Sequence, residues 1–118
     1  GLYGGMNQQS VEPHRWEMEP FNGGWSSSLF ISQDPIAIDS VALDFLKTET
    51  DLLPYSDNYL HEGALANDPP SGVKYDPENN GTRLDSLGVH EHWNNDKEKL
   101  YSKNINPESK GIELIKMK

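Results

Sequence analysis

The strongest structural signal in the chain is a helix predicted from Asp34 to about Thr48. Asp34 is a good helix cap, because its carboxylate can accept hydrogen bonds from backbone amides one turn further on. Pro35 falls at the first helical position, where its missing amide hydrogen costs nothing. The preceding residues 28–32, SLFIS, are short, apolar and β-rich, which predicts a strand. A strand, a two-residue link and a capped helix form a β–α unit, so we expect an α/β or α+β fold.

The rest of the chain predicts few further elements. A second helix is expected from Asp57 to Ala66, followed by a long loop over 67–86. Residues 87–93 are predicted to form a short strand or an extended segment, and 111–117 a final strand. Leu, Ile, Val and Phe make up 25 of the 118 residues, about 21%, close to the ~20% typical of disordered chains. The hydrophobic core must therefore be small and the loops long.

We expect residues 1–118 to form one fragment of a larger α/β domain. The first residues, GLYGG, carry no start signal for any element, and the core is thin. The expected partners are therefore the missing part of the parent chain and a second copy of this chain. The second copy would pair with an open strand edge around 28–32.

The charge balance argues against several partners. The net charge is −9, and the acidic residues concentrate before residue 97, whereas the segment 97–118 is basic. An acidic body repels phosphate backbones, so nucleic acid is not an expected partner. No apolar run is long enough to predict a membrane span. The basic end is either a solvated tail on the acidic body or a patch for a partner.

The chain contains no cysteine. Disulfides, thiolate metal sites and iron–sulfur ligation are therefore excluded within these residues.

Two acidic residues near the predicted strand–helix junction are candidate ligand-binding residues. Asp34 lies where open α/β sheets place ligands, although helix capping also explains it. On a helical wheel, Asp39 falls between apolar neighbours, whereas Ser40, Asp44 and Lys47 form a polar stripe about 100° away. Asp39 would then either bind a ligand or metal, or hold a neighbouring loop by hydrogen bonds.

His90 and His92 are the candidate metal ligands. In an extended segment, residues two apart point to the same side, so both imidazoles could reach one divalent ion. Asp39 or Asp34 would complete the coordination. The alternative is that each histidine makes a separate hydrogen bond within an ordered loop.

Five stretches together resemble one bacterial family: GLYGG at 1–5, PFNGGW at 20–25, SLFISQDPIAIDS at 28–40, YDPE at 75–78 and SLGVHEHWNN at 86–95. The chain is similar to the C-terminal part of proteins in the family called domain of unknown function 362, in a subgroup common in Bacteroidetes. The Ser-x-Asp-Pro-x-Ala-x-Asp core, here Ser32 to Asp39, is that family's most recognisable piece. The resemblance implies that residues 1–118 are a single C-terminal fragment of an α/β domain and that the N-terminal part of the parent chain is the missing partner. It also implies a periplasmic or exported parent protein and an unassigned function. Some relatives carry cysteine-rich iron–sulfur segments, which this cysteine-free chain does not share.

Two functions remain open at this level. The first is binding of a small polar ligand, with a divalent metal, near the strand–helix junction; whether the chain is an enzyme stays open. The second is a non-catalytic binding or scaffold module for a carbohydrate or a protein. Aromatic residues early in the chain, such as Trp16 and Trp25, suit a sugar but equally suit burial against the absent half.

Overall fold

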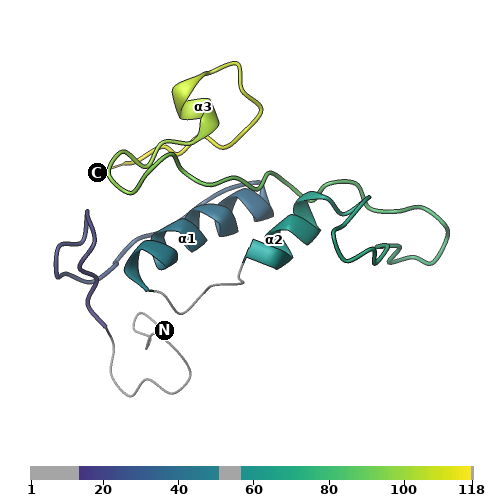
Figure 1. Cartoon of the computed structure of the whole chain (residues 1–118), viewed down its shortest axis with the longest axis horizontal. Coiled ribbons are helices and arrows are strands. Elements are labelled where there is room, and N and C mark those ends of the chain that lie inside the picture. Colours follow the sequence, from purple (N-terminus) through teal and green to yellow (C-terminus); the bar gives the residue numbers. More distant parts are fainter. Residues whose placement is uncertain (1–13, 51–56, 118) are drawn as a thin grey trace.

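The computed structural model describes residues 14–50 and 57–117. Three helices follow one another: α1 (Pro35–Glu49), α2 (Asp57–Ala64) and the short α3 (Ser102–Ile105). Long connections make up the remainder of the described chain. Figure 1 shows α1 beside α2, the 67–86 loop projecting away from them, and α3 standing apart on the other side of α1. No helix of the described residues is long and apolar enough to cross a membrane.

α1 forms where the sequence predicts it, and its start is capped as expected. The Asp34 carboxylate accepts a hydrogen bond from the Ala37 amide at 2.8 Å, and Pro35 opens the helix. The same carboxylate also accepts from the Val89 amide at 2.9 Å. The cap therefore joins the beginning of α1 to a segment more than fifty residues later.

The expected strands are wrong. Within the described residues, strand-like pairing is limited to one bridge between Trp16 and Gly24. Residues 28–32 pair with no strand there, and Leu29 and Ile31 are each more than 80% exposed. A β-rich composition gives a strand only when a neighbouring strand is available, and no described segment pairs with this one, although Phe30 packs against Phe45.

The C-terminal strand expected over 111–117 is also absent, for a different reason. The backbone of this segment is satisfied by side chains. The Ile112 amide donates to Glu91 at 2.5 Å, and the Leu114 amide donates to Asn104 at 3.0 Å. The fold is thus a set of short helices with long loops, and not a sheet-based α/β unit.

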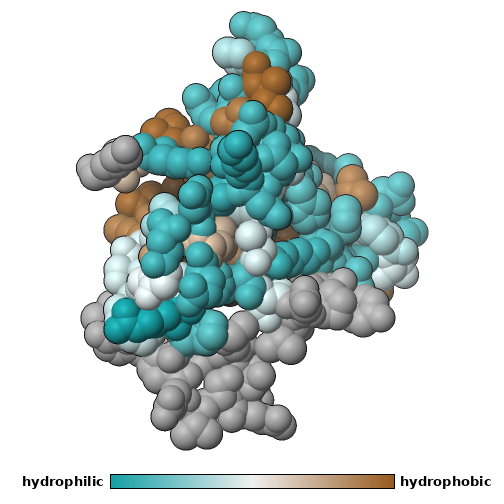
Figure 2. Space-filling model, turned by 60° about the vertical axis from the view of Figure 1, so that its left-hand side comes forward, coloured by the Kyte–Doolittle hydropathy of each residue, from teal (hydrophilic) through white to brown (hydrophobic). Residues whose placement is uncertain are grey.

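α1 lies between two small clusters of buried side chains. On one side, Ala37, Val41 and Phe45 pack with Tyr101 and Ile112 from the C-terminal region. On the other side, Ile36 and Leu43 pack with Leu60 of α2. Figure 2 shows apolar residues as separate patches on a largely hydrophilic face. The core is as thin as the composition predicts.

Gly63 lets α2 approach α1 closely. A Cβ atom at this position would lie 2.5 Å from Cδ1 of Ile36. The glycine weakens α2 as a helix former, yet it is the residue that permits the contact. α2 ends at Ala64, two residues earlier than the sequence predicts.

Asp34→Ala should lower the free energy of unfolding by about 2 kcal/mol, because the change removes both the helix cap and the bond to Val89. Urea titration followed by circular dichroism measures the loss. Asp39→Ala, on an exposed position of the same helix, is the matched control and should change stability by less than about 0.5 kcal/mol. Equal effects of the two substitutions would contradict the capping role.

Candidate metal centre

Asp44 on α1 is a buried acid, and its side chain is 5% exposed. Its carboxylate accepts three hydrogen bonds from the C-terminal region. The donors are His92 Nδ1 at 2.5 Å, the Trp93 amide at 3.0 Å and the Tyr101 hydroxyl at 2.7 Å. A buried carboxylate is tolerated only when such donors replace water, so Asp44 and this region depend on each other.

The helical-wheel interpretation of α1 is therefore wrong about which side is buried. Ser40 and Asp44, expected on a polar outer stripe, are buried, whereas Asp39 is exposed. The reason is that the segment around 89–93 lies on this side of α1 and brings donors with it. Asp34, the other candidate ligand, accepts hydrogen bonds from the Ala37 and Val89 amides.

The segment 89–93 runs along α1 in the same direction as the helix (Figure 1). Val89 bonds to Asp34, and Trp93 bonds to Asp44 ten residues later on the helix. Ten helical residues rise roughly 15 Å, and four extended residues span roughly 13 Å. The two carboxylates therefore act as matched anchors for an extended segment that carries both histidines between them.

Gly88 makes the first of these anchors possible. It has a positive φ of 152°, and a Cβ atom there would lie 1.8 Å from Oδ1 of Asp34. A larger residue at this position would push the segment away from the cap.

His90 and His92 lie on the same side of the segment, with ring centroids 5.0 Å apart. His90 Nδ1 is 2.8 Å from Ser40 Oγ, and that hydroxyl donates its single hydrogen to the Ile36 carbonyl at 2.8 Å. With the Ser40 hydrogen used in this way, His90 donates from Nδ1, and a lone pair is left on Nε2. Asp44 imposes the same arrangement on His92 by accepting from its Nδ1.

Asp57 at the beginning of α2 faces these two lone pairs. Its Oδ2 pairs with Lys47, whereas its Oδ1 lies 3.4 Å from His92 Nε2. Within the described residues, Asp57 Oδ1 and His90 Nε2 are buried atoms without a hydrogen-bond partner. Three hydrogen-bond acceptors, His90 Nε2, His92 Nε2 and Asp57 Oδ1, thus converge without a donor among them.

The charge states of the cluster suit a cation. Burial lowers the pKa of His90, and the neighbouring His61 and His92 lower it further against the attraction of Asp57 and Asp44. Burial raises the pKa of Asp57, but its hydrogen bond and charge interaction with Lys47 outweigh burial and leave the pKa below its ordinary value. Near neutral pH the cluster therefore offers a neutral imidazole beside a carboxylate.

Asp57, His90 and His92 could hold a metal ion, since one ligand atom from each lies within 4.8 Å of the others. Zinc bonds of about 2.0–2.1 Å place two ligands of a tetrahedron roughly 3.3 Å apart, close to the 3.4 Å between Asp57 and His92. Asp44 and Ser40 take the place of the outer partners that usually orient metal-binding histidines.

The sequence identifies the two histidines but not their third partner. It predicts Asp34 or Asp39 in that place, and the structure does not bring either of them into the group of ligand atoms found among the described residues. Asp57 carries only a helix-capping signal in the sequence, 33 residues before His90. Its approach to His92 depends on how α2 packs against α1, which no local pattern encodes.

Two cavities flank α1. One of about 410 Å³ is lined by Lys47, Thr48, His92, Trp93 and neighbouring polar residues, so it lies beside the His92 end of the cluster.

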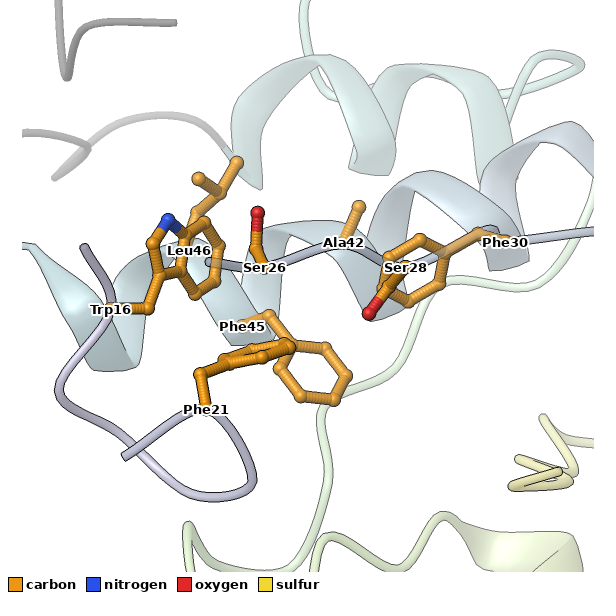
Figure 3. A pocket seen from close by; sticks show the side chains of 8 residues that line it. All are labelled: Trp16, Phe21, Ser26, Ser28, Phe30, Ala42, Phe45 and Leu46. Carbon is orange, nitrogen blue, oxygen red and sulfur yellow. The ribbon is translucent and has the colours of Figure 1, made fainter. Parts of the chain in front are cut away.

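The other cavity, of about 210 Å³, lies among the aromatic rings of Trp16, Phe21, Phe30 and Phe45 with Ser26 and Ser28 (Figure 3). These rings pack edge to face on one another, with Trp16 and Phe21 centroids 5.2 Å apart. These rings therefore pack within the described chain, which tests neither the carbohydrate interpretation nor burial against an absent half.

No protein-family model, curated protein or solved structure matches the chain.

Asp44→Asn should lower the free energy of unfolding by about 3 kcal/mol, because an amide cannot accept all three hydrogen bonds and leaves buried donors unpaired. Guanidinium titration measures the change, with the exposed Asp39→Asn as the control of identical chemistry. An unfolding midpoint for Asp44→Asn equal to that of the control would show that the buried network contributes nothing.

Alkaline pH should destabilise the protein through Tyr101. Burial and the hydrogen bond to Asp44 raise the pKa of Tyr101 above its ordinary value. The folded state therefore holds this proton more tightly than the unfolded state, and the stabilisation is complete below about pH 10 and declines above it. The stability advantage of the wild type over Tyr101→Phe should shrink by about 1.4 kcal/mol per pH unit above pH 10. A constant difference between the two proteins from pH 8 to 11 would contradict this.

Proposed function

We propose that this chain is a metal-binding module that holds one divalent transition-metal ion between Asp57, His90 and His92. The observation that carries the proposal is the convergence of three acceptor atoms with no donor among them. With the hydrogen of each histidine on Nδ1, next to Ser40 and Asp44, both Nε2 atoms present lone pairs toward Asp57 Oδ1.

A proton is the alternative cation, and it satisfies the cluster less well. If His92 were protonated, it would bridge Asp44 and Asp57 as an imidazolium. His90 Nε2 would still be a buried acceptor without a donor among the described residues. A metal ion satisfies all three atoms at once, which is why we favour it.

The ligand types select among metals. Two imidazole nitrogens favour zinc, iron, nickel and copper, whereas magnesium and calcium prefer all-oxygen sites. One carboxylate neutralises only half of the charge of a divalent ion. The other oxygen of Asp57 is paired with Lys47, so Asp57 offers the metal one oxygen atom. We therefore assign the site to the zinc-like metals.

The wild-type protein should bind one equivalent of Zn²⁺ near neutral pH, and Mg²⁺ should not compete at millimolar concentration. Isothermal titration calorimetry measures both. His90→Ala, His92→Ala and Asp57→Asn should each weaken binding by at least about tenfold, because each removes a ligand. His14→Ala is the matched control, since His14 pairs with Glu49 and is not in the group of candidate ligands found among the described residues. Absence of binding by the wild type, or equal binding by all four variants, would leave the proton-bridged cluster as the correct description.

A further inference from the structure

The helix that supplies Asp57 also supplies a third histidine. Asp57 and His61 are four residues apart on α2, so they lie on the same side of the helix one turn apart. His61 packs its ring edge to face against His90, with centroids 4.5 Å apart. Three histidines and one aspartate therefore meet where α2 faces the 89–93 segment.

We propose that His61 is the fourth protein ligand of the metal, and this inference rests on the proposed function of the site. The His61 side chain is exposed, and among the described residues its ring makes a contact with His90 but no hydrogen bond. The His61 nitrogens lie outside the group of ligand atoms that are within 4.8 Å of one another. Because the His61 ring contacts His90, rotation about its side-chain bonds is the movement that would bring a ring nitrogen to the ion.

The other nearby groups are less suited to this role. Lys47 is a cation and is already paired with Asp57. Asp44 accepts three hydrogen bonds that hold the loop, so ligating a metal would break them. His61 is thus the one nearby ligand, among the described residues, whose recruitment breaks no hydrogen bond.

A fourth protein ligand decides what kind of metal site this is. Zinc sites with four protein ligands are structural, whereas catalytic sites keep a position for water. With His61 bound, the ion would join both ends of the first turn of α2 to the histidine segment. Ser40 and Asp44 would extend that connection to α1. The site would then stabilise the packing of these segments around a thin core and would not activate water.

The test is NMR of ¹⁵N-histidine-labelled full chain titrated with Zn²⁺. Single variants His14→Ala, His61→Ala, His90→Ala and His92→Ala assign the four rings. On binding, the ring nitrogens of His61, His90 and His92 should all shift to metal-bound positions, whereas those of His14 should not. The wild-type spectrum reports the ligand directly, so the result does not depend on a variant that folds poorly.

Calorimetry provides the second measurement, with His14→Ala as control. His61→Ala should bind Zn²⁺ at least about tenfold more weakly than the control, since it loses a ligand. If the His90 and His92 ring nitrogens shift on adding Zn²⁺ while those of His61 do not, and His61→Ala binds as tightly as the control, the site has three protein ligands and the inference is overturned. If no ring shifts in the wild type, the metal-binding function itself fails.

Discussion

The carboxylate of Asp44 holds the C-terminal half of the chain against α1 by accepting hydrogen bonds from His92, Trp93 and Tyr101. The rest of the structure depends on this because strand pairing is nearly absent from the described residues. In a sheet, neighbouring strands satisfy backbone amides. Here side chains do so instead: Asp34 and Asp44 for the histidine segment, and Glu91 and Asn104 for residues 112–114. Because each such bond is specific in its geometry, a few polar residues determine the path of a long loop.

α1 and α2 were predictable from sequence because their signals are local, whereas the four-residue α3 was not predicted. The cap at Asp34 and the proline after it act within one turn, and the structure confirms both. The strands were not predictable, because a strand is stabilised by a partner that sequence composition does not reveal. Leu29 and Ile31 have strand-like chemistry and remain exposed. The resemblance to the domain of unknown function 362 family stays a prediction, as does the incomplete domain that it implies.

The sequence predicts two of the three candidate metal ligands, His90 and His92, but not Asp57. In an extended segment, side chains alternate between two sides, and this rule correctly places His90 and His92 together because it depends only on backbone geometry. The helical wheel misplaces the acids, because it assumes that the buried side of α1 is the apolar one. Asp44 is buried since the loop that covers it supplies donors, and Asp39 is exposed since no segment of the described structure covers it in a comparable way. The contribution of Asp57 follows from helix packing, which includes the close approach that Gly63 allows.

The histidine cluster and the thin core are connected by a physical argument. A ligand that binds only the folded state stabilises it by RT ln(1 + [L]/Kd), about 4 kcal/mol at a thousandfold excess over Kd. That is comparable to the whole stability of a small domain, typically about 5–15 kcal/mol. The cluster lies between α1, α2 and the 89–93 segment, which otherwise meet through few buried side chains. An ion bound there would stabilise the contacts that the apolar residues support least, in a chain that has no cysteine to form disulfides. Metal binding and folding would then be one equilibrium, so the folded population would depend on the free metal concentration.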